Sequence, residues 1–108
     1  MKEIDAIIEK LIKFRDDRNW KQFHTPDNIA KSVVLEAAEL LENYQWGENQ
    51  VDVENVKEEI ADIVGYCLLL CEHYDFDLIQ ILNEKIKKND EKYPVDKAYG
   101  KADKYTKL

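Results

Sequence analysis

The chain of 108 residues contains few residues that break or bend regular structure. It has only three glycines and two prolines, which leaves little material for the turns that join many short strands and so favours a few long helices. The longest apolar run, from Ile63 to Cys71, is far shorter than the roughly 20 residues that a membrane-spanning helix requires. The N-terminus also lacks the uninterrupted apolar stretch of a signal peptide. We therefore expect a cytoplasmic protein that has no membrane partner.

Cysteine is equally scarce, with only Cys67 and Cys71 in the chain. Four residues apart on a helix, the two thiols share a face but are badly placed to form a disulfide. We interpret them as buried hydrophobic side chains. A zinc site that also uses His73 is disfavoured, because the remaining ligands are missing.

Positive charge is in deficit, since 16 lysines and arginines face 23 acids and the net charge is −7. This balance disfavours binding to a nucleic-acid polymer, which depends on basic side chains that displace counterions. A small phosphorylated ligand remains possible, because a metal ion can bridge carboxylates to phosphates. The length suits one domain over residues 1–108, with a polar tail from about residue 95. A domain of this size buries only about 60–70% of its unfolded surface, so helices that are apolar on several sides need a partner subunit.

Hydrophobic residues recur at helical spacing in four segments, which predicts an all-α fold of four main helices in an up-down bundle. Thr25 is the expected N-cap of the second helix, and residues 47–52 form the expected loop before the third. The far half of the third helix is apolar all round, which predicts burial on every side. The expected apolar stripe of the second helix consists of Ile29, Val33, Ala37, Leu40, Leu41 and Tyr44. The expected helices span about residues 2–18, 26–46, 53–74 and 78–92.

Two pairs of acids stand out on the second and third helices. Glu36 and Glu39 form one pair and Glu59 and Asp62 the other, each with i, i+3 spacing. That spacing lets both members of a pair reach one point beside the apolar face. If the two helices pack antiparallel, the pairs can converge on one place.

Four close carboxylates repel one another and are costly to bury, and a divalent cation removes that cost. Oxygen ligands without His or Cys favour Mg²⁺ or Mn²⁺. A solvated acidic face is the alternative interpretation of the same acids. A ferritin-like di-iron site is rejected, because neither His24 nor His73 lies three residues after a glutamate.

Longer segments around these acids resemble a known family. LEAAELLENYQW followed by EEIADIVGY resembles the ExxE…ExxD signature of the all-α MazG-type nucleotide pyrophosphohydrolases. FRDDRNWKQFHTPDNIA, KIKKNDEKYP and the terminal KYTKL are similar to the dCTP pyrophosphatase branch of that family. The resemblance runs from about Phe14 to Leu108. The sequence departs from the family at Leu35, where glycine is common. The loop at residues 47–52 is also shorter than in animal dCTP pyrophosphatases. Both departures leave the base preference open.

The resemblance implies roles for particular residues. Glu36, Glu39, Glu59 and Asp62 correspond to the Mg²⁺ ligands. Trp20, His24 and Trp46 correspond to residues that line the nucleobase pocket, and Lys85, Asn89 and Tyr93 to residues that contact the phosphates or sugar. The family forms a tight dimer, often a dimer of dimers, with sites at subunit interfaces. A homodimer or homotetramer is therefore expected here.

The expected activity is Mg²⁺-dependent hydrolysis of a nucleoside triphosphate to the monophosphate and pyrophosphate, in the cleansing of the nucleotide pool. The expected substrate is dCTP or a modified dCTP. Glu36 and Glu58 are the candidates for the general base. One alternative is a hydrolase of the same fold that acts on dUTP, a purine triphosphate or a phosphoribosyl nucleotide. The other is a non-catalytic helical oligomer.

Overall fold

The computed structural model describes residues 2–108, and within that range every regular element is helical and no strand occurs. The predicted all-α class is therefore confirmed. None of the described helices combines the length and apolarity needed to cross a membrane. The chain divides into two compact units, residues 1–76 and 77–108, and the single domain over 1–108 stays a prediction. The α-helices are α1 (Lys2–Asp17), α2 (Pro26–Glu42), α3 (Val53–Tyr74), α4 (Leu78–Lys92) and α5 (Val95–Ala98), with 3-10 turns at Lys21–Phe23, Glu48–Gln50 and Tyr105–Lys107.

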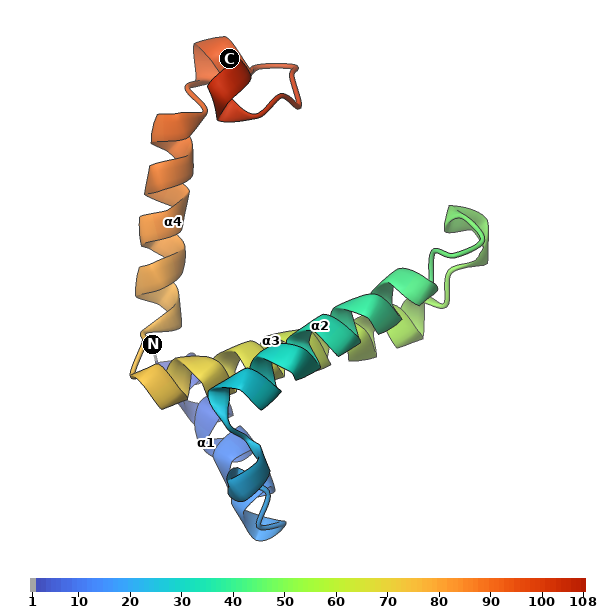
Figure 1. The fold of residues 1–108 in the computed structure, drawn as a ribbon, viewed down its shortest axis with the longest axis vertical. Coiled ribbons are helices and arrows are strands. Elements are labelled where there is room, and N and C mark those ends of the chain that lie inside the picture. The colour runs from blue at the N-terminus through green and yellow to red at the C-terminus, as the bar shows by residue number, and fades with distance from the viewer. Residues whose placement is uncertain (1) are drawn as a thin grey trace. The chain divides into compact units, whose positions relative to one another are not determined.

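The first unit is built on an antiparallel pair, in which α2 lies side by side with α3 (Figure 1). The connection of residues 43–52 is short enough for these consecutive helices to lie next to each other. Helix α1 packs across α3 and completes the unit. The core consists of Ile29, Leu68, Leu69 and Cys71, which are 3–6% exposed. Both cysteines are free, as predicted, and burial raises the pKa of the Cys71 thiol.

Aspartates stand at the start of α3 and α4 and at the end of α3. The side chain of Asp52 accepts a hydrogen bond from the backbone N–H of Asn55 at 3.2 Å, and Asp77 accepts one from Gln80 at 3.0 Å. Each bond satisfies an N–H group that the first helical turn leaves unpaired. Asp75 ends α3 in the left-handed conformation, at φ 58°. The predicted bounds of these two helices are therefore confirmed.

The start of α2 differs in one detail from the expectation. Thr25 occupies the N-cap position with extended backbone angles, but its side chain does not cap the helix. Its hydroxyl donates to Asp27 Oδ1 at 2.6 Å, and this hydrogen bond lowers the pKa of the Asp27 carboxyl.

The end of α2 was predicted wrongly, because the helix stops at Glu42 and not at about residue 46. The Asn43 amide lies within hydrogen-bonding distance of the carbonyls of Glu39 and Leu40, at 3.3 and 3.4 Å. It also donates to Asn55 Oδ1 at 2.9 Å, which ties the end of α2 to the start of α3. Side-chain bonds to the last carbonyls compete with helix continuation, so residues 43–46 form turns.

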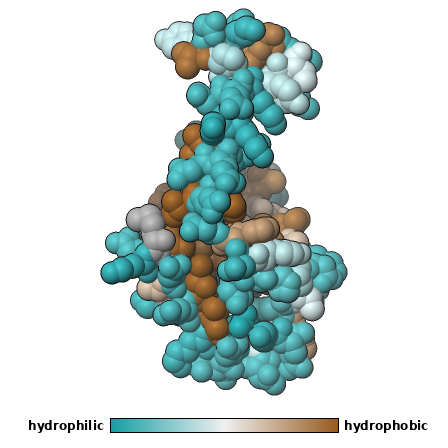
Figure 2. Space-filling view, turned by 90° about the vertical axis from the view of Figure 1, so that its left-hand side faces the viewer, coloured by the Kyte–Doolittle hydropathy of each residue, from teal (hydrophilic) through white to brown (hydrophobic). Residues whose placement is uncertain are grey.

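The apolar stripe of α2 was also only partly correct. Ile29 is buried and Val33 and Leu40 are half-buried, whereas Ala37 is exposed and Leu41 and Tyr44 are 70% and 42% exposed. The reason is that α3 is the main packing partner of α2, so the side of α2 that faces away from α3 is largely uncovered. Figure 2 shows apolar side chains at the surface among hydrophilic ones. The large apolar residues of α2 and α3 that are at least 45% exposed are Val34, Leu35, Leu41, Val53, Ile60, Val64 and Tyr74.

In the second unit, the tail packs against the end of α4. Tyr93 and Tyr105 meet edge to face, with ring centroids 6.0 Å apart. Lys92 Nζ lies 5.0 Å from the centroid of the Tyr105 ring, within cation–π range. The tail expected from about residue 95 is therefore folded against the end of α4 and contains α5.

Candidate metal centre and adjoining cavity

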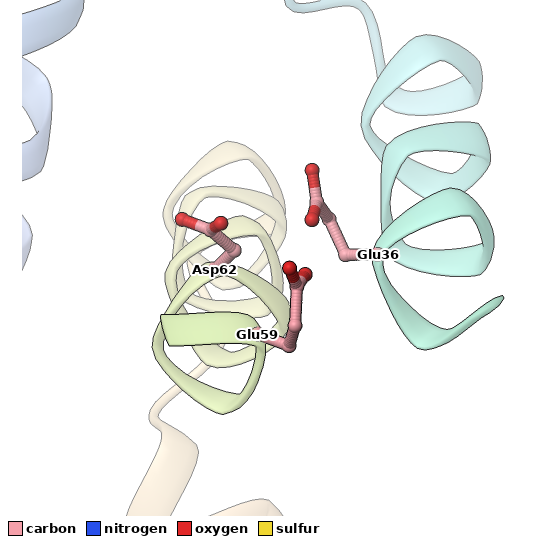
Figure 3. A group of neighbouring side chains, drawn as sticks. All are labelled: Glu36, Glu59 and Asp62. Carbon is pink, nitrogen blue, oxygen red and sulfur yellow. The ribbon is translucent and has the colours of Figure 1, made fainter. Parts of the chain in front are cut away.

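Three of the four predicted acids converge between α2 and α3. Glu36 projects from α2 toward Glu59 and Asp62 on α3 (Figure 3). One oxygen from each carboxylate lies within 4.8 Å of the other two. The i, i+3 spacing places Glu59 and Asp62 on one side of α3, and the antiparallel packing brings Glu36 opposite them. The predicted convergence of the two helices is therefore seen in these three residues.

The cluster is partly buried and incompletely paired, since Glu36 and Glu59 are shielded while Asp62 is exposed. Glu59 is 7% exposed and Glu36 is half-buried. No donor among the described residues forms a hydrogen bond with Glu36 Oε2 or Glu59 Oε2, although both atoms are shielded from solvent. The hydrogen bond that a protonated Glu36 shares with Glu59, the burial of the group, and the carboxylates of Glu39 and Asp62 together raise the pKa of Glu36 to about 7. Near neutral pH, the cluster therefore binds a proton or needs another cation.

These observations fit a divalent metal ion. An oxygen atom that is buried and lacks a donor is costly unless a positive charge approaches it. The donor set consists of carboxylate oxygens alone, which suits a hard cation such as Mg²⁺ or Mn²⁺ better than Zn²⁺.

The remaining predicted metal ligand, Glu39, and the candidate base Glu58 lie outside this group. Glu39 follows Glu36 by one turn and is exposed. Together with Glu59 it borders a polar cavity of about 330 Å³ toward the α2–α3 connection, whose wall also includes Asn43 and Asn55. Glu58 is exposed and is not part of the three-carboxylate group.

A second cavity, of about 140 Å³, opens next to the carboxylates between α1 and α3. Asp62 borders it and so belongs to both sites. Trp20 and His24, which follow α1, form part of its wall, as does Arg15. The rest of the wall consists of Leu11, Phe14, Ala61, Gly65, Tyr66 and Leu69. A largely apolar, aromatic cavity with a few polar groups is the usual form of a small-molecule site.

The aromatic rings of the cavity wall pack against one another in pairs. Trp20 meets Phe14 edge to face at 5.8 Å between centroids, and His24 meets Tyr66 at 6.3 Å. Burial and the nearby charge of Arg15 lower the pKa of His24, so its imidazole is neutral at pH 7. Packing between rings holds them in place before any ligand arrives.

Arg15 is a buried cation in this wall, with a side chain that is 8% exposed. Its Nε donates to Asp16 Oδ1 at 2.9 Å, and one terminal nitrogen lies 3.7 Å from Glu72. Arg15 also borders a third cavity, of about 450 Å³, near the start of α2.

The remaining residues implied by the resemblance lie elsewhere. Trp46 is 75% exposed and does not border the aromatic cavity. Lys85 and Asn89 are exposed on α4, and Tyr93 follows its last residue, so all three belong to the second unit. Their roles toward a substrate stay predictions.

Several wall residues of the cavity were not singled out from the sequence. Tyr66 lies one turn after Asp62 on α3, so helical spacing from the predicted acid contained a signal for it. Leu11 and Phe14 carried no such signal, because only the packing of α1 across α3 brings them to Asp62.

Comparisons with known proteins agree with this geometry. A sequence profile described as the MazG-like family matches residues 31–108, which include both acidic pairs. The chain is 33% identical to dCTP pyrophosphatase 1 of Mus musculus and 30% identical to that of Homo sapiens, in each case over 89% of this chain and 62% of the relative. It therefore spans about three fifths of the length of these curated relatives.

A solved structure is similar over most of both chains. A pyrophosphatase from Archaeoglobus fulgidus is 37% identical, with a TM-score of 0.76. The match covers 85% of this chain and 93% of that one. The profile, the curated relatives and the shared fold confirm the resemblance, and the chain belongs to the MazG-like family.

Proposed function

We propose that this protein is a Mg²⁺-dependent nucleoside triphosphate pyrophosphohydrolase, which converts a triphosphate and water to the monophosphate and pyrophosphate. The observation that carries the proposal is the position of Asp62. This one carboxylate belongs to the acidic cluster of α2 and α3 and also borders the aromatic cavity. A nucleotide needs both features side by side, because its phosphates require a cation and its base requires a largely apolar pocket.

Glu36, Glu59 and Asp62 would hold the metal, and Glu39 extends the same acidic surface toward the polar cavity. When bound, Mg²⁺ supplies positive charge to the phosphate oxygens and lowers the pKa of a coordinated water. The carboxylates cannot bind phosphate without it, since the two groups carry the same charge. With the metal bound, these carboxylates would hold the phosphate chain beside Asp62, which borders the aromatic cavity.

The general base is proposed to be Glu36, with Glu58 as the second candidate. The support is its position, because Glu36 belongs to the group of carboxylates that would hold the metal. Glu58 is exposed and lies outside the group of carboxylates that would hold the metal. Glu36 takes the proton from the attacking water only if the metal leaves one of its oxygens free.

The base is proposed to lie in the aromatic cavity, between rings such as Trp20 and Tyr66 and next to the neutral His24. Stacking on aromatic side chains contributes about 1–3 kcal/mol per base. The proposed substrate is dCTP or a modified dCTP, in cleansing of the nucleotide pool. The support is that the similar mouse and human proteins are named dCTP pyrophosphatase 1.

The protein is further proposed to act as a homodimer or homotetramer. Leu41 on α2 and Val64 on α3 are 70% and 45% exposed, and a second copy would cover them. In such an assembly Trp46, Lys85, Asn89 and Tyr93 would complete the site, as the resemblance implies. Light scattering at several concentrations tests the assembly, and Leu41→Asp should shift it toward the monomer. The cytoplasmic location stays a prediction.

The deciding experiment measures pyrophosphate release over a panel of nucleotides, with Mg²⁺ and with EDTA. The panel contains dCTP, 5-methyl-dCTP, dUTP, dATP, ATP and a phosphoribosyl nucleotide. We expect the highest kcat/KM for a deoxycytidine triphosphate and no release in EDTA. Higher activity on another nucleotide would support the proposed reaction but would overturn dCTP as the proposed substrate.

Matched variants separate the cluster from general acidity. Glu59→Gln removes a buried carboxylate of the cluster, whereas Glu54→Gln removes an 80% exposed one from the same helix. We expect activity to be lost only in the first. If no nucleotide releases pyrophosphate and nucleotides cause no Mg²⁺-dependent thermal shift, the protein is a non-catalytic helical oligomer.

A further inference from the structure

Gly65 lies within the 22-residue helix α3, where a glycine needs an explanation. Glycine is the least favoured residue of a helix interior apart from proline. The other two glycines are explained by their backbone, because Gly47 and Gly100 have φ values of +94° and +74°. Gly65 has the ordinary backbone of a helix, which any residue adopts. Its lack of a side chain must therefore serve packing or a ligand.

Packing does not require glycine at this position. A Cβ atom added to Gly65 would meet only one atom within 4 Å, Leu11 Cδ2 at 3.7 Å. That distance is an ordinary van der Waals contact, so α1 could pack against an alanine without moving. The fold of the first unit therefore tolerates a side chain that the sequence does not have.

The space beside Gly65 belongs to the aromatic cavity. Gly65 and Leu11 both border it, and Asp62 lies one helical turn before Gly65. The cavity measures only about 140 Å³, so a single methyl group on its wall removes a substantial part of the volume. The metal-binding carboxylates lie beyond the reach of that group, since no atom of theirs is within 4 Å of it.

We propose that Gly65 is a specificity-determining residue, which sets the largest ring that the aromatic cavity accepts. The inference rests on the proposed function in that the ligand of the cavity is taken to be a nucleobase. The missing side chain leaves room at the α1 wall for a substituent on the ring. A side chain at position 65 narrows the cavity while the carboxylate cluster stays as it is.

The test compares Gly65→Ala with the parent protein on triphosphates of increasing base size, namely dCTP, 5-methyl-dCTP and 5-iodo-dCTP. We expect kcat/KM for 5-iodo-dCTP to fall about 10-fold to 100-fold more than that for dCTP, the usual effect of one methyl group in an apolar pocket. The thermal midpoint should not fall, because alanine favours the helix. Mg²⁺ affinity should stay unchanged. Ala30→Ser, which adds one atom to an exposed position of α2, is the matched control and should alter neither activity nor selectivity.

A second variant tests whether the side chains at positions 11 and 65 share the same space. Leu11→Val shortens the neighbouring side chain, so in the Gly65→Ala background it should restore part of the lost activity on 5-iodo-dCTP. Such non-additive behaviour is expected only of residues that share one space. Equal losses for all three nucleotides, or no recovery with Leu11→Val, would overturn the proposal.

Binding of free bases separates this inference from the proposed function. Cytosine and 5-iodocytosine can be titrated while the NMR signals of the Trp20 indole N–H and the Gly65 amide are followed. If the protein hydrolyses no nucleotide but both bases bind, and Gly65→Ala excludes 5-iodocytosine alone, the proposed reaction fails and the size limit stands. If neither base shifts these signals, the size limit fails, whatever the outcome for hydrolysis.

Discussion

The two halves of the candidate site differ in what holds them together. The carboxylates of Glu36, Glu59 and Asp62 lie between α2 and α3 and repel one another. The walls of the aromatic cavity lie between α1 and α3 and attract one another, since Trp20 and its neighbours make apolar and ring contacts. The first region stores unfavourable electrostatic energy that a cation relieves, and the second is formed by ordinary packing before any ligand binds.

Because the two regions are held together differently, metal dependence and base preference can be separate properties of one small domain. Charge changes in the carboxylate cluster should affect metal binding and turnover. Volume changes in the cavity should affect substrate affinity and selectivity. Asp62 is the one residue that belongs to both, so it should couple them.

The largest effect is expected for Asp62→Asn. It removes one negative charge from the cluster and alters the cavity mouth, so we expect kcat/KM to fall by more than about 100-fold, the upper range for residues that merely support a metal ligand. Steady-state kinetics and Mg²⁺ titration should both register the change. Glu54→Gln, on the same helix, should behave as the parent protein. Unchanged Mg²⁺ affinity in Asp62→Asn would separate this residue from the metal site.

A smaller and more selective effect is expected for Trp20→Ala. Loss of one stacked base contact costs about 1–3 kcal/mol, which raises KM by about 5-fold to 150-fold. Mg²⁺ binding measured by calorimetry should not change. Tyr99→Ala, at a position that is 86% exposed, should have no effect on KM. An equal loss of metal affinity in Trp20→Ala would show that the two regions are not separable.

The cluster should also make stability depend on pH. The folded-state pKa of Glu36, about 7, exceeds its ordinary value of 4.5, so between these values the folded protein holds a proton that the unfolded chain has lost. The resulting stabilisation is complete below the lower value and is lost as pH rises through 7. In EDTA, at fixed protein concentration, the midpoint of thermal unfolding should therefore fall by on the order of 5 °C between pH 5 and pH 8.

Two comparisons isolate this effect. Glu36→Gln cannot titrate, so the fall should be smaller in that variant. Mg²⁺ binds the charged carboxylate, so the difference in midpoint between Mg²⁺ and EDTA should widen with rising pH. A parent protein and a Glu36→Gln variant with the same pH dependence would contradict the coupling of Glu36 to Glu59.

The smallest effect is expected outside both regions. Asn55→Ala removes the 2.9 Å hydrogen bond from Asn43 that joins the end of α2 to the start of α3. We expect a loss of about 1 kcal/mol in the free energy of unfolding, measured with urea. Because Asn55 also borders the polar cavity, Mg²⁺ affinity should be followed in parallel. No loss of stability would show that the bond is replaced by water.

Much of the local structure was predictable. The bounds of α3 and α4 were confirmed, because Asp52 and Asp77 cap these helices, and Pro94 and the polar residues around them leave few alternatives. The end of α2 was not, because the Asn43 amide contacts carbonyls of its own helix and also donates to Asn55 on α3. A bond between two helices cannot be deduced from the periodicity of either one.

Within the site, the acids were predictable and the cavity walls were not. The i, i+3 spacing of Glu59 and Asp62 is local, so it survives any tertiary arrangement that keeps α3 helical. The position of Leu11 beside Gly65 depends on where α1 crosses α3, and apolar spacing on α1 is equally compatible with many crossing points.

By itself, the sequence determined that the chain is helical and which acids share a helix face, because both follow from spacing along a single element. Only the tertiary structure decided that Glu36 faces Glu59 and Asp62 while Glu39 lies to one side, and that a cavity opens beside them. These are distances between elements, and they are set by how whole faces pack together and exclude water.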